Sequence, residues 1–379
     1  MPLFLLAFFL FYGGGHLYLF SKLRAAYPCS RRATLLLSLW LLLMTSAPLL
    51  VHGWARHASG QLVHLAAIVA YGWMGLLFYF VVIGVLLDAL SLAGRLRRRS
   101  RRRRLSAGHL VTVTILLAMA LVGYGYFEAR AIRLERVVLP TAKLSPGVDR
   151  LKIVQLSDLH LGLLVGRERL RTVLSTVRRA EPDIIVATGD LLDGQGDNLP
   201  EFAALLREIP ARHGKFAILG NHELYSGSAH ATAFLEAAGF VVLRNEARAV
   251  AGGLVIAGVD DRRGATWPLA AADGEGPLLA ALDAENRFVL LLKHRPQVNQ
   301  ASVGRFDLQL SGHVHGGQLF PFGLVVERFY PVTAGALQPL TRGSLYVSRG
   351  AGTWGPPIRV LAPPEVNLIE LRAAPPGAG

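Results

Sequence analysis

The stretch Ser311-Gly312-His313-Val314-His315-Gly316-Gly317-Gln318 places two histidines two residues apart, shortly after the apolar run Phe306–Leu310. On an extended backbone, side chains two residues apart point to the same face, so both imidazoles are expected on one side of a strand end. The adjacent glycines permit backbone angles that other residues avoid, and they leave room for a ligand. Two histidines do not complete a hydrolytic metal centre, so the missing ligands must come from elsewhere in the chain.

Polar side chains also follow four earlier apolar runs, each of which is predicted to be a strand. In chain order they are Asp158 and His160 after Leu151–Leu156, Asp190 and Asp193 after Asp183–Ala187, Asn221 and His222 after Lys215–Leu219, and His294 after Phe288–Leu292. Open α/β sheets place their sites at the carboxyl ends of strands. Carboxylates, imidazoles and amide oxygens are ligands that hard and borderline divalent cations accept. One such cluster is a common turn sequence, but five in this order predict a site for two metal ions.

The pattern of apolar and polar residues predicts alternating strands and helices in the same part of the chain. Besides those strands, we expect helices at Arg167–Ala180, Pro200–Glu208 and Ala229–Ala238, and strands at Val241–Leu243, Ala247–Val250, Leu254–Val259, Leu345–Ser348 and Glu365–Leu371. The economical architecture is an α/β sandwich of two packed sheets with flanking helices over residues 150–372. Residues 128–149, which end in the turn sequence Ser145-Pro146-Gly147, are predicted to be a linker, and residues 373–379 a disordered tail.

The first 127 residues have a different composition. Four apolar segments, about Leu3–Phe20, Ala33–Val51, Leu62–Leu87 and Leu110–Phe127, are each long enough to cross a hydrocarbon core of about 30 Å as a helix. They are too uniformly apolar for amphipathic surface helices. We therefore predict a transmembrane domain of about four helices at residues 1–127, in contact with a lipid bilayer.

Basic residues are concentrated in this same third of the chain. It carries 13 Lys and Arg residues against one acid, Asp88, so most of the net charge of +14 lies outside the predicted sandwich, and a nucleic-acid partner is not expected. The loop with Lys22 to Arg32 and the loop with eight arginines between Arg95 and Arg104 are expected in the cytoplasm. This places the sandwich on the extracytoplasmic side. Cys29 is the only cysteine, which excludes an intrachain disulfide.

Read in order, the motifs are D-x-H, G-D-x-x-D, G-N-H-[DE], a lone H and G-H-x-H, and the complete set resembles the calcineurin-like metallophosphoesterase superfamily. The resemblance covers about residues 150–372. The sequences Ser157–Gly162 and Gly312–Gln318, with the late Pro357-Ile358-Arg359 and Pro364-Glu365, are similar to a membrane-associated bacterial branch. Some of its members carry transmembrane spans before the catalytic domain. The resemblance implies an αββα metallophosphoesterase sandwich and a bacterial cytoplasmic membrane.

The resemblance also implies a role for each motif residue. Asp158, His160 and His315 would hold the first metal ion, Asn221, His294 and His313 the second, Asp190 would bridge them, and His222 would be the acid at the leaving oxygen. The metal identity stays open among Mn, Fe, Zn, Co and Ni, which all accept nitrogen and oxygen ligands. Asp193 and Asp260 are expected either to orient ligand histidines or to close turns. Arg295 and Arg359 are expected either to assist phosphate binding or to lie solvated at the surface.

These features lead to one function hypothesis and two alternatives. Two divalent ions with Asp158, Asp190 and a bridging hydroxide keep a charge of about +1, which attracts a phosphate group, and the bound water ionises near neutral pH. We expect a membrane-anchored hydrolase that cleaves a phosphomonoester, phosphodiester or pyrophosphate bond by metal-bridged hydroxide attack; in one version the substrate is lipid-linked. The alternatives are a UDP-2,3-diacylglucosamine-type pyrophosphate hydrolase of lipid A synthesis, which would need a cytoplasmic domain, and a non-catalytic membrane sensor or binding protein.

Overall fold

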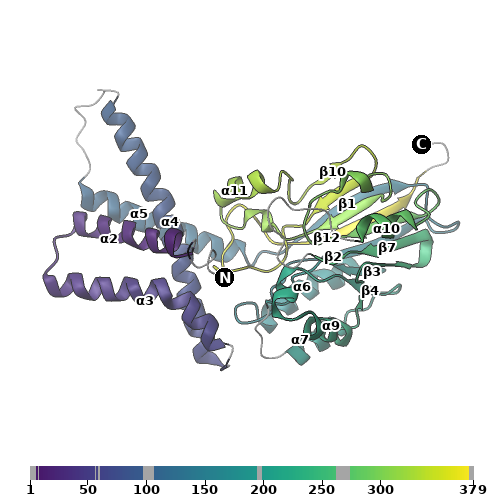
Figure 1. Ribbon diagram of the computed structural model, residues 1–379, viewed down its shortest axis with the longest axis horizontal. Helices are drawn as coiled ribbons and strands as arrows, with labels where there is room; N and C mark the ends of the chain where they lie inside the picture. Colours follow the sequence, from purple (N-terminus) through teal and green to yellow (C-terminus); the bar gives the residue numbers. More distant parts are fainter. Residues whose placement is uncertain are drawn as a thin grey trace. The chain divides into compact units, whose positions relative to one another are not determined.

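The structure is a computed structural model that describes residues 6, 8–55, 57–58, 60–96, 106–193, 199–261 and 274–374. The chain forms two compact units (Figure 1). One comprises Met1–Phe127 with Gly355–Ile358, and the other Glu128–Trp354 with Arg359–Gly379. The boundary falls where the long apolar segments of the sequence end.

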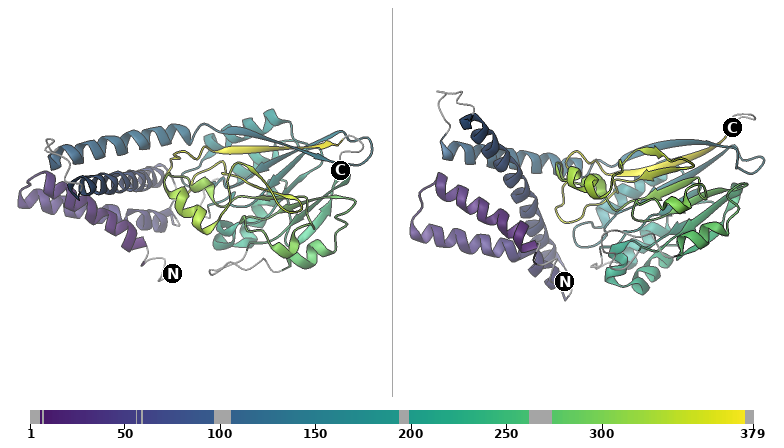
Figure 2. Two further views of the ribbon diagram at one scale, coloured as in Figure 1. Left: turned by 90° about the horizontal axis from the view of Figure 1, so that it is seen from above. Right: turned by 45° about the horizontal axis from the view of Figure 1, so that its top comes forward.

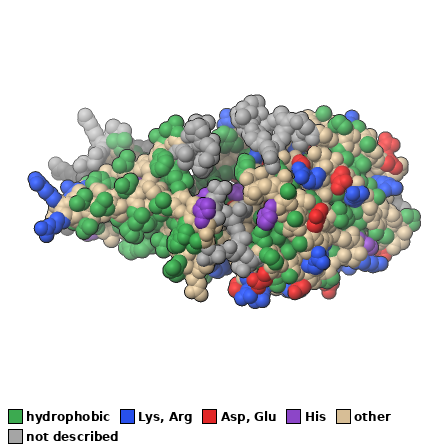
Figure 3. Space-filling view, turned by 60° about the horizontal axis from the view of Figure 1, so that its bottom comes forward, with side chains coloured by type: hydrophobic (Ala, Val, Ile, Leu, Met, Phe, Trp, Pro, Cys, Tyr) green, Lys and Arg blue, Asp and Glu red, His purple; other side chains and the backbone are tan. Residues whose placement is uncertain are grey.

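The first unit is helical because its long apolar runs satisfy their backbone hydrogen bonds within each helix. Its elements are the short π-helix η1 (Phe9–Gly13) and the helices α2 (Gly14–Ala26), α3 (Arg31–Ala55), α4 (Gln61–Leu96) and α5 (Ala107–Glu128). Among the described residues, α3, α5 and the Gln61–Gly94 part of α4 are long and apolar enough to cross a membrane. The first predicted span, Leu3–Phe20, is described only in part, and its described part is helical. Hydrophobic side chains cover these helices on the face shown in Figure 3.

The second unit contains two sheets of six strands each, and two further views show them (Figure 2). The first sheet has the order β1-β12-β2-β3-β4-β5, formed by Arg133–Thr141, Glu365–Ala373, Arg150–Leu156, Ile184–Ala187, Lys215–Ala217 and Val241–Val242. The second has the order β10-β11-β9-β8-β7-β6, formed by Leu337–Pro339, Ser344–Val347, Leu308–Ser311, Phe288–Leu292, Leu254–Gly258 and Glu246–Ala249. Strands β2 to β5 are mutually parallel, as are β7, β8, β9 and β11. Their carboxyl ends can therefore present side chains at one edge of each sheet.

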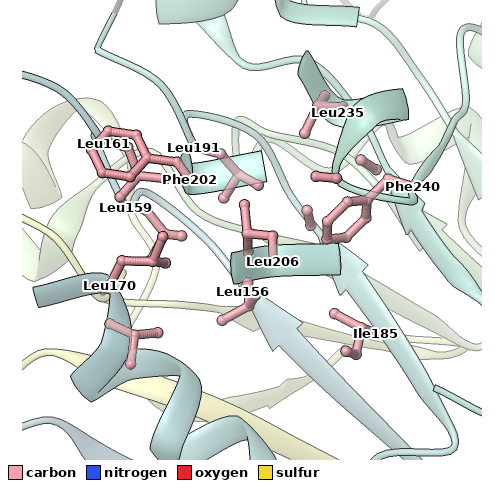
Figure 4. Packing of buried hydrophobic residues seen from close by; sticks show 14 of the residues in the cluster. Leu156, Leu159, Leu161, Leu170, Ile185, Leu191, Phe202, Leu206, Leu235 and Phe240 are labelled. Carbon is pink, nitrogen blue, oxygen red and sulfur yellow. The ribbon is translucent and has the colours of Figure 1, made fainter. Parts of the chain in front are cut away.

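Alternation along the strands separates two cores. In β2, Leu151 and Ile153 contribute to the cluster shared by both sheets, whereas Val154 and Leu156 belong to the cluster on the opposite face. That second cluster packs the first sheet against the helices α6 (Arg167–Ala180), α7 (Leu199–Arg207) and α9 (Ser228–Ala237). Figure 4 shows Leu170, Phe202, Leu206 and Leu235 of these helices beside Leu156 and Ile185.

The outer face of the second sheet packs against the short helix α10 (Glu275–Ala280) through Leu278 and Leu279. Each sheet is thus covered by helices on its outer side and by the other sheet on its inner side. This four-layer arrangement confirms the predicted αββα sandwich.

Two expectations at the borders of the sandwich differ from the structure. The predicted linker 128–149 contains β1, which pairs in parallel with β12 from Arg133 opposite Glu365 to Thr141 opposite Ala373. The charged residues in β1 obscured its strand pattern, and its partner lies far away in the sequence. Ala373, predicted to begin the disordered tail, instead belongs to β12 and donates to the Asp149 carbonyl. Residues 375–379 lie outside the described part of the chain.

Two short helices near the histidine stretch were not predicted either. Helix α8 (Asn221–Ser226) begins directly at a motif residue, and α11 (Phe322–Phe329) follows the histidine stretch. Both are too short to show a helical period in the sequence.

Candidate metal centre

The loops after β2 and β3 hold their polar residues in an uncommon backbone conformation. Asp158, His160 and Asp190 have φ values of 52°, 51° and 52°, in the left-handed region that non-glycine residues seldom adopt. The His160 N–H donates to the Asp190 carbonyl at 3.0 Å, which ties the two loops together. All three side chains are buried. Local strain of this kind persists where the surrounding structure enforces it, and it is concentrated at functional sites.

Two glycines let the carboxylates approach the neighbouring loops. A Cβ atom on Gly220 would lie 2.2 Å from Asp190 Oδ1, and one on Gly312 would lie 2.2 Å from Asp158 Oδ2. Asp158 also accepts hydrogen bonds from the backbone N–H of His313 at 3.0 and 3.1 Å. The glycines of the G-N-H and G-H-x-H motifs are therefore needed for close packing around the carboxylates.

The first cluster of ligand atoms comprises Asp158, His160 and His315. The Nε2 atoms of the two histidines lie 3.0 Å apart, and His315 Nε2 lies 3.5 Å from Asp158 Oδ1. Burial, together with His160 and Arg359, holds the pKa of His315 well below its usual value, so its ring is neutral. A neutral imidazole beside a carboxylate is the form that a divalent cation binds.

The second cluster comprises Asp190, His294 and His313, with Asn221 beside them. His294 Nε2 lies 3.1 Å from Asp190 Oδ2, 3.1 Å from Asn221 Oδ1 and 3.2 Å from His313 Nδ1. On the other side of the ring, His294 Nδ1 donates to the Thr188 carbonyl at 2.8 Å, which fixes the ring orientation. Nε2 is thereby directed at three other ligand atoms.

The electrostatics of this second cluster favour a cation among the ligand atoms. Burial alone would lower the pKa of His294, but Asp190 and Asp158 raise it to about 10. The pKa of His313, by contrast, is held well below its usual value by burial and by His294. The cluster therefore stabilises one positive charge where its atoms converge. A divalent ion at this point would satisfy the same carboxylates, so the donor set fits a metal ion.

His222 lies against the first cluster without belonging to its ligand atoms. Its Nδ1 lies 2.9 Å from Asp193 Oδ1, and its ring meets that of His160 edge-to-face at 4.6 Å. The side chain is 19% exposed, so it reaches the surface of the centre. Burial alone would lower its pKa, but the hydrogen bond to Asp193 and the nearby Asp190 raise it.

Asp193 and Asp260, for which two roles were open, have different surroundings. Asp193 contacts His222 and lies 3.4 Å from His160 Nδ1, and these hydrogen bonds lower its pKa to about 2 although burial acts in the opposite direction. It therefore orients histidines. Asp260 is instead paired with Arg244 at 2.6 Å.

For three residues at the centre, the sequence predicted either no role or a wrong one. Buried Glu223 accepts hydrogen bonds from the backbone N–H groups of Asp190 and Gly220 at 2.8 Å and of Leu192 at 3.0 Å. Its position as the last residue of the G-N-H-[DE] motif was the available signal. Tyr330, whose hydroxyl lies 3.0 Å from His313 Nε2, had no sequence signal.

Arg359 is the third, and neither predicted alternative was right. Its side chain is fully buried and donates to the carbonyls of Gly352, Ala362, Arg349 and His315 at 2.8, 3.0, 2.9 and 3.3 Å. Burial lowers its pKa to about 9. It is neither solvated nor open to a phosphate, and it holds loops of the first cluster in place.

Arg295 also differs from a solvated residue. It pairs with Asp261 at 3.1 Å, and its side chain is only 12% exposed.

The expectation of an extended backbone at the two histidines was wrong. His313 and His315 have φ values of 73° and 51°, and a short 3-10 helix begins at His315. Gly316 and Gly317 do adopt left-handed angles. However, the space beside Gly317 is taken by the next helix, because a Cβ atom there would lie 2.2 Å from the Cα atom of Gly323.

The chain is similar to several known proteins. Residues 151–317 match the family model described as calcineurin-like phosphoesterase. The chain is 40% identical over 259 residues to an uncharacterized metallophosphoesterase of Aquifex aeolicus, covering 68% of this chain and 98% of that protein. It is 30% identical over 332 residues to a transmembrane protein with metallophosphoesterase domain of Danio rerio, covering 82% and 75%. Among solved structures, a dimetal phosphatase from Danio rerio is 13% identical over 59% of this chain and 93% of that one, with a TM-score of 0.38.

Proposed function

This chain belongs to the calcineurin-like metallophosphoesterase family, and on that premise we propose that it is a membrane-anchored hydrolase whose two metal ions are held by seven residues of the centre. The first ion would be held by Asp158, His160 and His315, the second by Asn221, His294 and His313, and Asp190 would bridge them. The observation that carries the proposal is the convergence of His294 Nε2, Asp190 Oδ2, Asn221 Oδ1 and His313 Nδ1 within about one hydrogen-bond length.

Two divalent ions bound there would supply the positive charge that polarises a phosphoryl group and lowers the pKa of a water molecule. The protein's own contribution is to orient the ligands. Glu223 fixes the loops that carry Asp190 and Asn221, and the Thr188 carbonyl fixes His294. Rigid ligands cost no reorganisation when charge develops on the phosphoryl oxygens.

His222 is proposed as the acid that protonates the leaving oxygen. Asp193 holds its Nδ1 side and, with Asp190, raises the pKa of the ring, which favours the protonated form that an acid needs. Its backbone N–H donates to Asp190 Oδ1 at 2.9 Å, which fixes the residue next to the ligands without making it one. Its partial exposure would let the ring meet the departing group of a phosphomonoester, phosphodiester or pyrophosphate.

The membrane topology is part of the same proposal. Among the described residues, three apolar helices long enough to cross a membrane precede the sandwich. The chain is also similar over 82% of its length to a relative named as a transmembrane protein with metallophosphoesterase domain. The excess of Lys and Arg in two of the connecting loops supports an extracytoplasmic sandwich in a bacterial cytoplasmic membrane. A site anchored to a bilayer in this way suits a lipid-linked phosphate ester. A lipid A precursor hydrolase would need the opposite orientation.

The test is hydrolysis of bis-nitrophenyl phosphate and nitrophenyl phosphate by the full chain, stripped of metal and reloaded with Mn²⁺. Replacing Asp190 with asparagine is expected to lower the rate about 10³-fold, because the shared carboxylate charge is lost. The control is Asp283→Asn, an exposed aspartate in a turn far along the chain, which should retain full activity. Equal rates for Asp190→Asn and the wild type would refute the assigned centre.

A further inference from the structure

A short apolar segment lies exposed next to the histidine stretch. We define the apolar rim as Phe320, Phe322, Leu324 and Val325, each of which is between 47% and 61% exposed. No charged residue occurs between Leu319 and Val326. Single exposed apolar side chains are ordinary, but four within six residues form a patch of the kind that marks a contact with lipid or protein.

The apolar rim is fixed to the metal centre at both ends of α11. At its start, Gly323 lies so close to Gly317 that a Cβ atom on Gly317 would be 2.2 Å from the Gly323 Cα atom. At its end, the Tyr330 hydroxyl lies 3.0 Å from His313 Nε2. Val326 packs inward against the cluster that contains Val314. The exposed side chains therefore keep a fixed position beside the two histidines.

The chain enters the sandwich at this same end. Strand β1 is parallel to β12, and β12 is antiparallel to β2, so the start of β1 lies with the carboxyl end of β2. Figures 1 and 2 agree with this placement of the start of β1. In both, β12 ends near the marked C-terminus, and α11 lies at the opposite end of the sandwich.

The tether between the last apolar helix and the sandwich is short. Helix α5 ends at Glu128 and β1 starts at Arg133. Even when fully extended, the chain between these two residues spans at most about 18 Å. The Glu128 carboxylate also accepts a hydrogen bond from the Leu361 N–H at 2.8 Å, and the Arg133 N–H donates to the Pro364 carbonyl at 2.9 Å. The connection is therefore held against the loop that precedes β12, at the end where the metal centre lies.

Further amphipathic side chains are exposed around His222. Trp354 and Tyr225 are 55% and 67% exposed, and their rings lie 6.1 and 6.3 Å from the His222 ring. Tryptophan and tyrosine are enriched where proteins meet the headgroup region of a bilayer. Like the short tether and the apolar rim, their exposure next to the metal centre indicates that this end of the sandwich faces a bilayer.

We propose that the apolar rim docks into the headgroup–acyl boundary of the bilayer that holds the chain's own apolar helices. The short connection between α5 and β1 favours the bilayer as the partner of the rim, because it keeps the end of the sandwich that carries the rim within reach of the bilayer surface. Docking places His222 and the metal centre at the lipid headgroups. The inference rests on the proposed membrane anchoring and does not depend on the proposed reaction.

Cys29 is the only cysteine, so a Cys29→Ser background gives single labelling sites. The environment-sensitive fluorophore NBD would be attached at Val325→Cys, with Leu324→Cys as a second site in case the first variant does not fold. Val241→Cys, exposed in the edge strand β5, is the aqueous control, and Leu116→Cys, exposed in α5, is the membrane control. Each full-length protein is reconstituted into phosphatidylcholine vesicles with and without brominated acyl chains.

Docking predicts that brominated lipid quenches the label at 325 about twofold or more, as it does the label at 116, while the label at 241 is quenched only by aqueous iodide. The inference is overturned if the label at 325 behaves like the label at 241. Protection of the label at 325 from both quenchers would also overturn it, because a protein would then cover the rim. An unquenched label at 116 would show that the anchoring itself fails, whatever the hydrolytic activity of the protein.

Discussion

Replacing Arg359 with lysine keeps the buried positive charge but removes the planar fork of donors. Arg359 donates to four backbone carbonyls, and two of these acceptors, on His315 and Gly352, belong to the loops around the first cluster. A lysine ammonium carries three donors on one atom, so at least one of the four carbonyls loses the donor that Arg359 supplies, and because the acceptors are spread apart we expect two to lose it. The His315 carbonyl would still accept from the Gln318 N–H at 3.1 Å.

Each buried carbonyl left without a donor costs about 1–3 kcal/mol. If two carbonyls lose their donor, Arg359→Lys is expected to lower the free energy of unfolding by about 2–6 kcal/mol. Because the affected loop carries His315, the first metal ion should bind about 10–100-fold more weakly, as is typical when a residue that orients a ligand is changed.

The assay is Mn²⁺ titration of the full chain, with hydrolysis of bis-nitrophenyl phosphate followed at each concentration. The variant should need more Mn²⁺ for half-maximal rate, and excess Mn²⁺ should restore most of the rate, because Arg359 positions a ligand and does not touch the substrate. The control is Arg287→Lys, at an exposed position. An unchanged Mn²⁺ requirement, or a lower rate that saturating Mn²⁺ leaves unrestored, would refute this reasoning.

Two further predictions concern the packing of the centre and the acid stability of the sandwich. Gly220→Ala should lower the rate about 100-fold, because its Cβ atom would lie 2.2 Å from a carboxylate oxygen of Asp190; Gly276→Ala, with no atom within 4 Å of the new Cβ, should leave the rate unchanged. The hydrogen bond from Arg136 is the chief cause of the lowered pKa of Glu370. Glu370 therefore stabilises the fold above its unfolded pKa of about 4.3, and this stabilisation is lost as the pH falls through its folded pKa. Thermal unfolding of Glu370→Gln should therefore start at a lower temperature than that of the wild type at pH 6, and the two curves should converge near pH 3; a difference that persists at pH 3 would contradict the assignment.

The ligand types and their order along the chain could be predicted because each one follows a buried strand within a few residues. Asp158, Asp190, Asn221 and His294 needed only the local rule that polar residues at strand ends meet at the sheet edge. The structure brings these residues together with the two late histidines. The four-layer architecture followed from the alternation of strands and helices in the same way.

The remaining features depend on contacts that are distant in sequence. Arg359 was misjudged because an arginine is normally solvated, and only the folded loops show four carbonyls around it. Strand β1 was missed because its partner β12 stabilises a segment whose own sequence is charged and half exposed. Helix α11 was missed because eight residues give little period, and its position depends on the close approach of two glycines.

The central claim is that one chain holds two divalent ions that share Asp190. The most direct measurement is electron paramagnetic resonance of the full chain saturated with Mn²⁺, together with the count of bound Mn²⁺ per chain. We predict two Mn²⁺ per chain with the broad spectrum of a magnetically coupled pair, which Asp190→Asn should convert to an uncoupled six-line signal. A single uncoupled Mn²⁺ per chain in the saturated wild type would contradict the account.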